Sequence, residues 1–331
     1  MKELIITKND ENQRLDKFLL KYMNKSTKAF IYKMLRKKRI KLNSKKAEGN
    51  EIIKDGDILT FYISDETISS FMEEKVLEKI KIHFTPIYED ENILVVFKPV
   101  GILSHTEKKD DKNTLTDEIL YYLYEKGEYK KDSPFTPSVC NRLDRNTCGL
   151  IIAAKNLMAS QEINKAIKEN KTEKYYLTVV YGNTKKEDTL KGYHTKNEKT
   201  NEVIITEFER EGSKEAITKY KTLKQKNGYS LLEVNLVTGR SHQIRAHLSS
   251  YGFYLIGDRK YGKNNINNIF SEKFNLKNQF LISYKLIWKQ NEGPLSYLYN
   301  KTFECKIPKE LKTITDYIFN NNVSWFLKNI W

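Results

Sequence analysis

One aspartate lies between two arginines in the stretch Asn141-Arg142-Leu143-Asp144-Arg145-Asn146-Thr147-Cys148-Gly149-Leu150. The apolar run that follows, Ile151-Ile152-Ala153-Ala154, predicts a buried strand. A carboxylate held beside cations at the entrance of a strand stays ionised and can attack an electrophile or accept a proton. The pattern therefore predicts a catalytic role for Asp144. The alternative is a surface Asp-Arg pair in a loop that leads into a strand.

The charge balance points to a polyanionic partner. The chain has 331 residues, long enough for two domains, with a net charge of +15 and a pI of about 9.3. The charge alone leaves RNA, DNA and anionic membranes open. The first residues reach a polar run too soon for a signal peptide, and no apolar run approaches the roughly 18 residues of a membrane span. We therefore expect a cytoplasmic protein without membrane attachment.

The cysteines and histidines do not form a recognisable metal or cofactor site. Cys140, Cys148 and Cys305 are too few and too scattered for a disulfide framework or a zinc site, and small packed thiols are expected. His242 and His247 lie five residues apart, which misses the i, i+4 spacing of zinc-binding helices. Neither a Gly-x-Gly-x-x-Gly motif nor a phosphate-binding loop is present, so neither metal nor cofactor is expected.

The amino-terminal part combines a basic helix with short strands. Ten Lys or Arg residues and no acid lie between Lys25 and Lys46. Apolar residues recur at helical spacing from Phe30 to Leu35, and Asn24 or Ser26 could cap the helix. Strands are expected over 39–43 and 58–63, with a turn over 54–57. The residues expected to contact nucleic acid from the free surface are Lys33, Arg36, Lys37 and Arg39. A solvated basic face is the alternative.

The charged segment 66–84 is expected to link this part to a larger body. There, strands are predicted over 93–97, 173–180 and 231–237, and helices around Leu115 and near the carboxyl end, at residues 311–318. After the turn at 238–240, Ser241 could cap a helix that ends at Gly252. Arg245 falls about 110° from the centre of the apolar stripe of this helix, so its side chain could reach a neighbouring site.

Residues 141–150 resemble the signature of the RluA-type RNA pseudouridine synthases, usually His-Arg-Leu-Asp-x-x-Thr-Ser-Gly-Leu. The positions that agree are Arg142, Leu143, Asp144, Thr147, Gly149 and Leu150. Two positions depart from the signature, because Asn141 replaces the histidine and Cys148 the serine. The resemblance implies that Asp144 is the catalytic residue. The flanking Arg142 and Arg145 are expected to contact RNA, and Arg142 could fill the space that an extruded base leaves.

Three further segments resemble this family in the same order. Lys98-Pro99-Val100-Gly101 matches its opening turn, where Lys98 is expected either to touch RNA or to have a structural role. The family's Lys-x-Tyr strand aligns with Tyr176, implying that this ring packs against the target base, although a slip of one residue would select Tyr175. Gly-Arg-Ser-His-Gln-Ile-Arg-Ala-His-Leu, over 239–248, implies that Arg245 pairs with the catalytic aspartate, and 257–262 match the motif that follows.

These observations predict an α+β protein with two domains. Residues 1–65 resemble the small RNA-binding domain named after ribosomal protein S-four, residues 66–84 are the linker, and residues 85–331 form the catalytic domain. That domain is expected to hold a mixed, mainly antiparallel β-sheet with flanking helices around a central cleft. The resemblance implies an enzyme that isomerises uridine in structured RNA, with ribosomal RNA of the large subunit favoured. We expect a monomer, although the sequence does not determine the oligomeric state. A synthase for transfer RNA and a non-enzymatic RNA-binding or ribosome-assembly protein are the alternatives.

Overall fold

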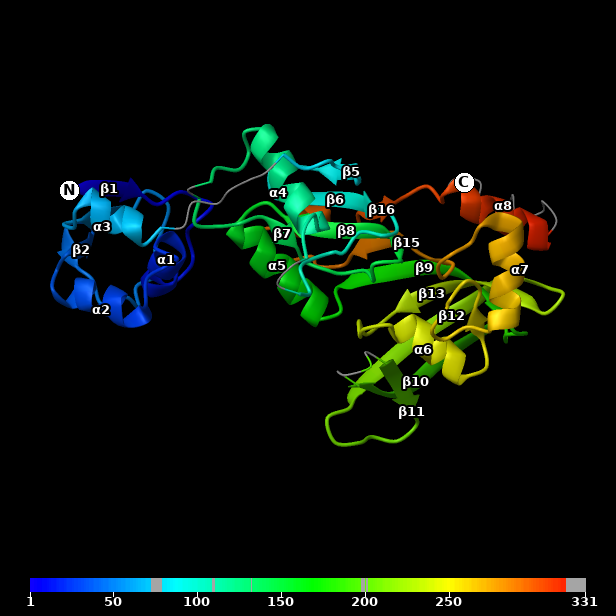
Figure 1. The fold of residues 1–331 in the computed structure, drawn as a ribbon. Helices are drawn as coiled ribbons and strands as arrows, with labels where there is room; N and C mark the ends of the chain where they lie inside the picture. Colours follow the sequence, from blue (N-terminus) through cyan, green and yellow to red (C-terminus); the bar gives the residue numbers. More distant parts are fainter. Residues whose placement is uncertain (73–78, 109–110, 132, 198–199, 201, 320–331) are drawn as a thin grey trace.

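The computed structural model describes the chain except for residues 73–78, 109–110, 132, 198–199, 201 and 320–331. Two separate sheets organise it, one of four strands and one of 12 strands (Figure 1). Nearly all strand pairs are antiparallel, and helices pack on both sheets. The predicted α+β class, with a mainly antiparallel sheet in the larger part, is confirmed.

The amino-terminal sheet carries the basic helix. The strand order is β1-β4-β2-β3, with β1 (Lys2–Ile5), β4 (Ile58–Phe61), β2 (Ile40–Leu42) and β3 (Lys45–Lys46). Helices α1 (Leu15–Tyr22), α2 (Lys28–Arg36) and α3 (Asp65–Ser70) accompany it. Apolar residues of α1 and α2 pack with the sheet in one buried core, because they recur at intervals of three or four residues.

Two local expectations for this part are corrected. Helix α2 is capped by Thr27, whose Oγ1 accepts a hydrogen bond from Phe30 N at 3.2 Å, and not by Asn24 or Ser26. Thr27 has the extended backbone that a cap requires and directly precedes the first helical residue. Helix α3 lies in the segment expected to be a linker, yet its Ile68 is buried in the amino-terminal core. Residues 73–78 of that segment lie outside the described residues.

The large sheet runs through the rest of the chain in the order β11-β10-β12-β13-β9-β15-β8-β6-β5. Its strands are β5 (Thr85–Glu89), β6 (Ile93–Lys98), β8 (Cys148–Ala154), β9 (Thr172–Tyr181), β10 (Glu187–Asn197), β11 (Glu202–Thr206), β12 (Lys214–Lys226), β13 (Tyr229–Leu236) and β15 (Leu281–Trp288). Three short strands pair beside this path, namely β7 (Ser138–Val139), β14 (Tyr254–Leu255) and β16 (Thr302–Glu304).

Helices cover both faces of this sheet. One core joins the sheet to α5 (Leu157–Lys168), α7 (Asn264–Phe274) and α8 (Lys309–Phe319), and the 3-10 turn η1 (Ser296–Leu298) also lies there. The other core joins it to α4 (Leu115–Glu125) and α6 (Gln243–Ser250). The predicted helices around Leu115, after residue 240 and at 311–318 are confirmed. The N-cap of α6, however, is His242 and not Ser241.

Strand β8 continues the Asp144 loop into the centre of the sheet, where all seven of its residues are buried. Gly149 pairs with Ser283 at the parallel junction of β8 and β15. A Cβ at Gly149 would lie 2.2 Å from the carbonyl oxygen of Ser283, and the φ of Gly149 is +125°. Only glycine fits this close approach without displacing β15. The glycine of the signature therefore has a packing reason.

Candidate active site

Hydrogen bonds hold the backbone of the Asp144 loop, while its carboxylate is partly exposed. Ser104 Oγ donates to Leu143 O at 2.8 Å and accepts from Leu143 N at 3.0 Å, and Asp144 O accepts from Thr147 N at 3.0 Å. The side chain of Asp144 is 23% exposed. The surrounding chain thus fixes the loop while leaving the carboxylate accessible.

Lys98 holds the other side of this loop. Its Nζ donates to the carbonyl oxygens of Pro99 at 3.0 Å, Ile102 at 2.8 Å and Arg145 at 3.2 Å. The side chain is fully buried, and this burial lowers the pKa of Lys98 to about 8. A buried ammonium group that serves three carbonyl groups cannot contact RNA here. Of the two roles expected for Lys98, the structural one is present, and its assignment to the RNA-binding residues is wrong.

We expect Lys98→Met to lower the unfolding free energy by about 3 kcal/mol, because three buried carbonyl groups lose their donor. The loss should grow with pH. The pKa of Lys98 is about 8 in the folded protein and about 10.4 in an unfolded chain. Between these values the unfolded chain binds more protons, so the lysine's contribution to stability rises with pH. Denaturant unfolding of both proteins at several pH values measures this difference. A difference independent of pH would contradict the assigned protonation.

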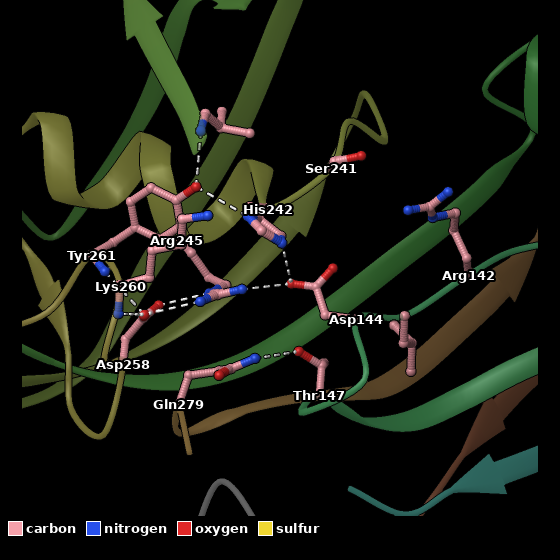
Figure 2. A network of polar contacts seen from close by, with 12 residues as sticks. Arg142, Asp144, Thr147, Ser241, His242, Arg245, Asp258, Lys260, Tyr261 and Gln279 are labelled. Carbon is pink, nitrogen blue, oxygen red and sulfur yellow. Dashed lines mark hydrogen bonds and ion pairs between the residues drawn. The ribbon is translucent and has the colours of Figure 1, made fainter. Parts of the chain in front are cut away.

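Arg245 binds two carboxylates at once (Figure 2). Its Nη1 lies 2.9 Å from Asp144 Oδ2, while its Nε and Nη2 bind the two oxygens of Asp258 at 2.7 and 3.0 Å. Asp258 is fully buried and also accepts from the backbone N–H groups of Lys260 and Tyr261. Burial acts to raise the pKa of Asp258, but the bonds and charge of Arg245 hold it below the usual value. The expected pairing of Arg245 with Asp144 is present, and Asp258 orients the guanidinium group.

A histidine and a tyrosine complete this network. His242 Nε2 lies 3.9 Å from Asp144 Oδ2, and His242 Nδ1 lies 3.0 Å from the hydroxyl of Tyr261. The oxygen of that hydroxyl accepts a hydrogen bond from Val203 N at 3.0 Å. The guanidinium carbon of Arg245 lies 5.1 Å from the centre of the Tyr261 ring. His247, which was weighed with His242 as a metal ligand, instead contacts Thr218 at 3.0 Å in the core.

The two adjacent tyrosines of β9 lie on opposite faces of the sheet. Tyr176 is 4% exposed and lines the same cleft as Asp144, whereas Tyr175 lines a second hollow and donates to Glu173 at 2.9 Å. Burial raises the pKa of Tyr176, so its hydroxyl is neutral. The register thus puts Tyr176, and not Tyr175, on the Asp144 side.

The cleft has a volume of about 550 Å³ and a basic lining. Asp144 is the acidic residue in its wall, and the basic residues there are Arg142, Lys168, Lys174, Arg240 and Arg245. The positive potential of such a lining attracts a polyanion to the cleft that contains the Asp144 carboxylate. Within the described part of the chain, no group of three or more His, Cys, Asp or Glu side chains could hold a metal ion.

The structure places the predicted RNA-contacting residues in two areas. Arg142 and Arg145 flank Asp144 with exposed side chains, and Arg142 lies 3.7 Å from Glu107. Lys33, Arg36, Lys37 and Arg39 are exposed in or just after α2 of the amino-terminal part. All six are accessible to a ligand.

The two departures from the signature have structural roles. Asn141 Oδ1 accepts from Ile152 N at 2.8 Å and so ties the loop to β8. Cys148 is buried, and burial raises the pKa of its thiol to about 12, so it is not a reactive thiolate. The expectation of packed, unreactive thiols therefore fits both Cys148 and Cys140, whose pKa burial also raises to about 12.

Sequence reasoning missed several members of the site. Ser104 carried no local signal, because it lies 39 residues before its partner Leu143. Asp258 and Tyr261 belong to the 257–262 segment that matched the family, and an aspartate held at a glycine turn could have suggested a partner for Arg245. His242 was weighed only as a metal ligand.

Comparisons with known proteins show the family to which the chain belongs. The family model for RNA pseudouridylate synthase matches residues 92–250, and that for the S4 domain matches residues 13–59. An RNA pseudouridine synthase of Mycoplasma capricolum is 33% identical over 307 residues, which cover 91% of this chain and 96% of the relative. The ribosomal large subunit pseudouridine synthase C of Rickettsia bellii is 33% identical over 297 residues, which cover 87% of this chain and 95% of the relative.

Solved structures share the fold. Human RNA Pseudouridylate Synthase Domain Containing 4 superposes with a TM-score of 0.54 at 18% identity, covering 69% of this chain and 90% of its own. Human RNA Pseudouridylate Synthase Domain Containing 1 gives a TM-score of 0.50 at 20% identity, with 75% of this chain and 97% of the human chain covered. In the described residues, no helix is long and apolar enough to cross a membrane. From the matched models and relatives it follows that the chain belongs to the RNA pseudouridine synthases and is an enzyme that isomerises uridine in RNA.

Proposed function

We propose that this enzyme modifies uridine in large-subunit ribosomal RNA and that Asp144 is its catalytic residue. The observation that carries the proposal is the ion pair of Asp144 with Arg245, at 2.9 Å in a basic cleft. An accessible carboxylate that pairs with a cation in a basic cleft can act on a sugar whose phosphates the basic residues bind.

The reaction needs only this chain's own residues at the reacting atoms. The bond from N1 of uracil to C1′ of the ribose breaks, the base turns, and C5 bonds to C1′. The hydrogen on C5 leaves as a proton, and N1 gains one, so the net change is an isomerisation. Asp144 either attacks the sugar or removes a proton from it.

The target nucleotide has to leave its stack to reach Asp144, at a cost of about a few kcal/mol. We infer that two residues offset this cost. Tyr176 lines the same cleft as the carboxylate, and its neutral ring could pack against an extruded base there. Arg142 is exposed at the mouth of the cleft and could occupy the space left in the RNA.

Large-subunit ribosomal RNA is favoured by two observations. Relatives from several Rickettsia species are named ribosomal large subunit pseudouridine synthase C. The S4 domain match coincides with the exposed basic residues of α2, which would hold phosphates without reading sequence.

A pseudouridine map tests the proposal. Total RNA from cells that lack the gene is compared after re-expression of wild type or Asp144→Ala. We expect a uridine of large-subunit ribosomal RNA to be modified only with wild type. A site in transfer RNA would overturn the substrate, and modification by Asp144→Ala would overturn the catalytic role. No change at any site would favour a non-enzymatic RNA-binding protein.

We also expect neutralisation of the basic surface to weaken RNA binding through electrostatics. Replacing Lys33, Arg36, Lys37 and Arg39 with Ala should reduce affinity for all structured RNAs alike. The slope of log affinity against log salt should fall by about 0.7–0.9 for each phosphate that the variant no longer neutralises. Filter binding at several salt concentrations measures the slope. An unchanged slope would show that this surface does not contact RNA.

A further inference from the structure

His242 has an unusual backbone for its place in the fold. It precedes α6 with a φ of +52°, in the left-handed region. Ten non-glycine residues of the described structure have a positive φ, and seven of them are Asn, which with Asp and His is found in this region more often than other residues with a Cβ. A histidine held there is a reason to ask what its ring does, because strained residues gather at functional sites.

The contacts of Tyr261 favour one of the two protonation states of a neutral His242 ring. The Tyr261 hydroxyl oxygen accepts from Val203 N, so its own proton is available for His242 Nδ1 at 3.0 Å. Among the described residues, no other acceptor binds that proton. With Nδ1 accepting, the proton of a neutral ring lies on Nε2, the nitrogen that faces Asp144 at 3.9 Å (Figure 2).

The surroundings favour the neutral ring. Burial lowers the pKa of His242, and the positive charges of Arg245 and Lys260 lower it further. The negative charges of Asp144 and Asp258 act in the opposite direction. The Tyr261 ring is itself held in place, because Arg245 packs over its face at 5.1 Å.

We propose that His242 is a positioning residue for the reaction. Tyr261 fixes its ring with the proton on Nε2, and this N–H restrains Asp144 Oδ2, so that Oδ1 is directed at the substrate. Oδ2 already binds Arg245 at 2.9 Å, and a second donor on the same oxygen would stop the carboxylate from turning. The 3.9 Å separation belongs to the free enzyme, where such bonds are commonly long and shorten with substrate. The inference rests on the proposed role of Asp144.

The first test reads the tautomer directly. The protein has five histidines, so the ring nitrogens of the full chain can be resolved by long-range ¹⁵N–¹H correlation, with His242→Gln used for assignment. We expect a neutral His242 protonated on Nε2, and loss of this single tautomer in Tyr261→Phe. Protonation on Nδ1 in the wild type would overturn the proposal.

The second test separates positioning from binding. Tyr261→Phe and His242→Asn should lower kcat by roughly 10-fold to 100-fold, with KM and RNA affinity unchanged. His242→Gln should recover most of the loss, because its amide nitrogen reaches the place of Nε2 and the shorter Asn does not. The matched control is Tyr251→Phe, which removes the hydroxyl of an exposed tyrosine just after α6 and should leave kcat unchanged.

The outcomes separate this inference from the proposed function. Turnover by Asp144→Asn would overturn the role of Asp144, whereas the tautomer experiment needs no turnover. If Asp144→Asn is inactive while Tyr261→Phe and His242→Asn match the wild type, the positioning role is wrong. A Gln variant no better than the Asn variant would overturn it as well.

Discussion

Asp144→Asn is expected to abolish pseudouridine formation while RNA affinity stays unchanged. The amide keeps the size of the side chain and can still accept from Arg245, but it is neither a nucleophile nor a base. Removal of a catalytic nucleophile commonly costs at least about 10³-fold in kcat. Single-turnover conversion of a ribosomal RNA fragment, followed by nucleoside analysis, measures the rate, and filter binding measures the affinity.

The structure supplies controls for this variant. Arg245 keeps Asp258 as a partner when Asp144 is neutral, so the melting temperature should change little. Asp188→Asn is the matched substitution, because Asp188 pairs with Lys185 at 3.1 Å outside the cleft and should be dispensable. If Asp144→Asn is folded and retains turnover, Asp144 is not the catalytic residue.

Arg245→Ala is expected to destabilise the fold as well as abolish turnover. It removes the cation that pairs with Asp144 and leaves Asp258, which is fully buried, without its bidentate partner. Breaking a buried pair by removing one member costs about 3–5 kcal/mol, because the remaining charge is uncompensated. Denaturant unfolding measures the loss in free energy.

A second substitution tests the reason for that loss. Adding Asp258→Asn to Arg245→Ala removes the unpaired charge and should restore part of the stability, though not the turnover. Arg245→Lys should fall between wild type and Arg245→Ala, because a single ammonium group cannot bind both carboxylates in the same geometry. An unchanged unfolding free energy in Arg245→Ala would show that the Asp258 pair does not stabilise the protein.

The local elements of this fold were predictable from the sequence. The helix containing Leu115, Ile119 and Leu123 became α4, and the strand expected over 173–180 became β9. The errors lie at the ends of elements, as at Ser241, where neighbouring residues could each act as the cap. Gln243 takes part in fixing that end, since its Oε1 accepts from Arg240 N at 3.0 Å.

Periodicity, charge and short motifs are properties of residues close together in the sequence. The sequence therefore predicted the strand after Asp144 and the basic helix, and the family motifs implied the pairing of Asp144 with Arg245. The contacts of Lys98, Ser104 and Asp258 appeared only after folding. Ser104 meets Leu143 across 39 residues, and Lys98 meets Arg145 across 47. Likewise, the contact of Val203 with Tyr261 spans 58 residues. Such partners are determined by how distant strands pack and by the need of buried polar groups for hydrogen bonds. Neither factor produces a pattern in neighbouring residues of the sequence.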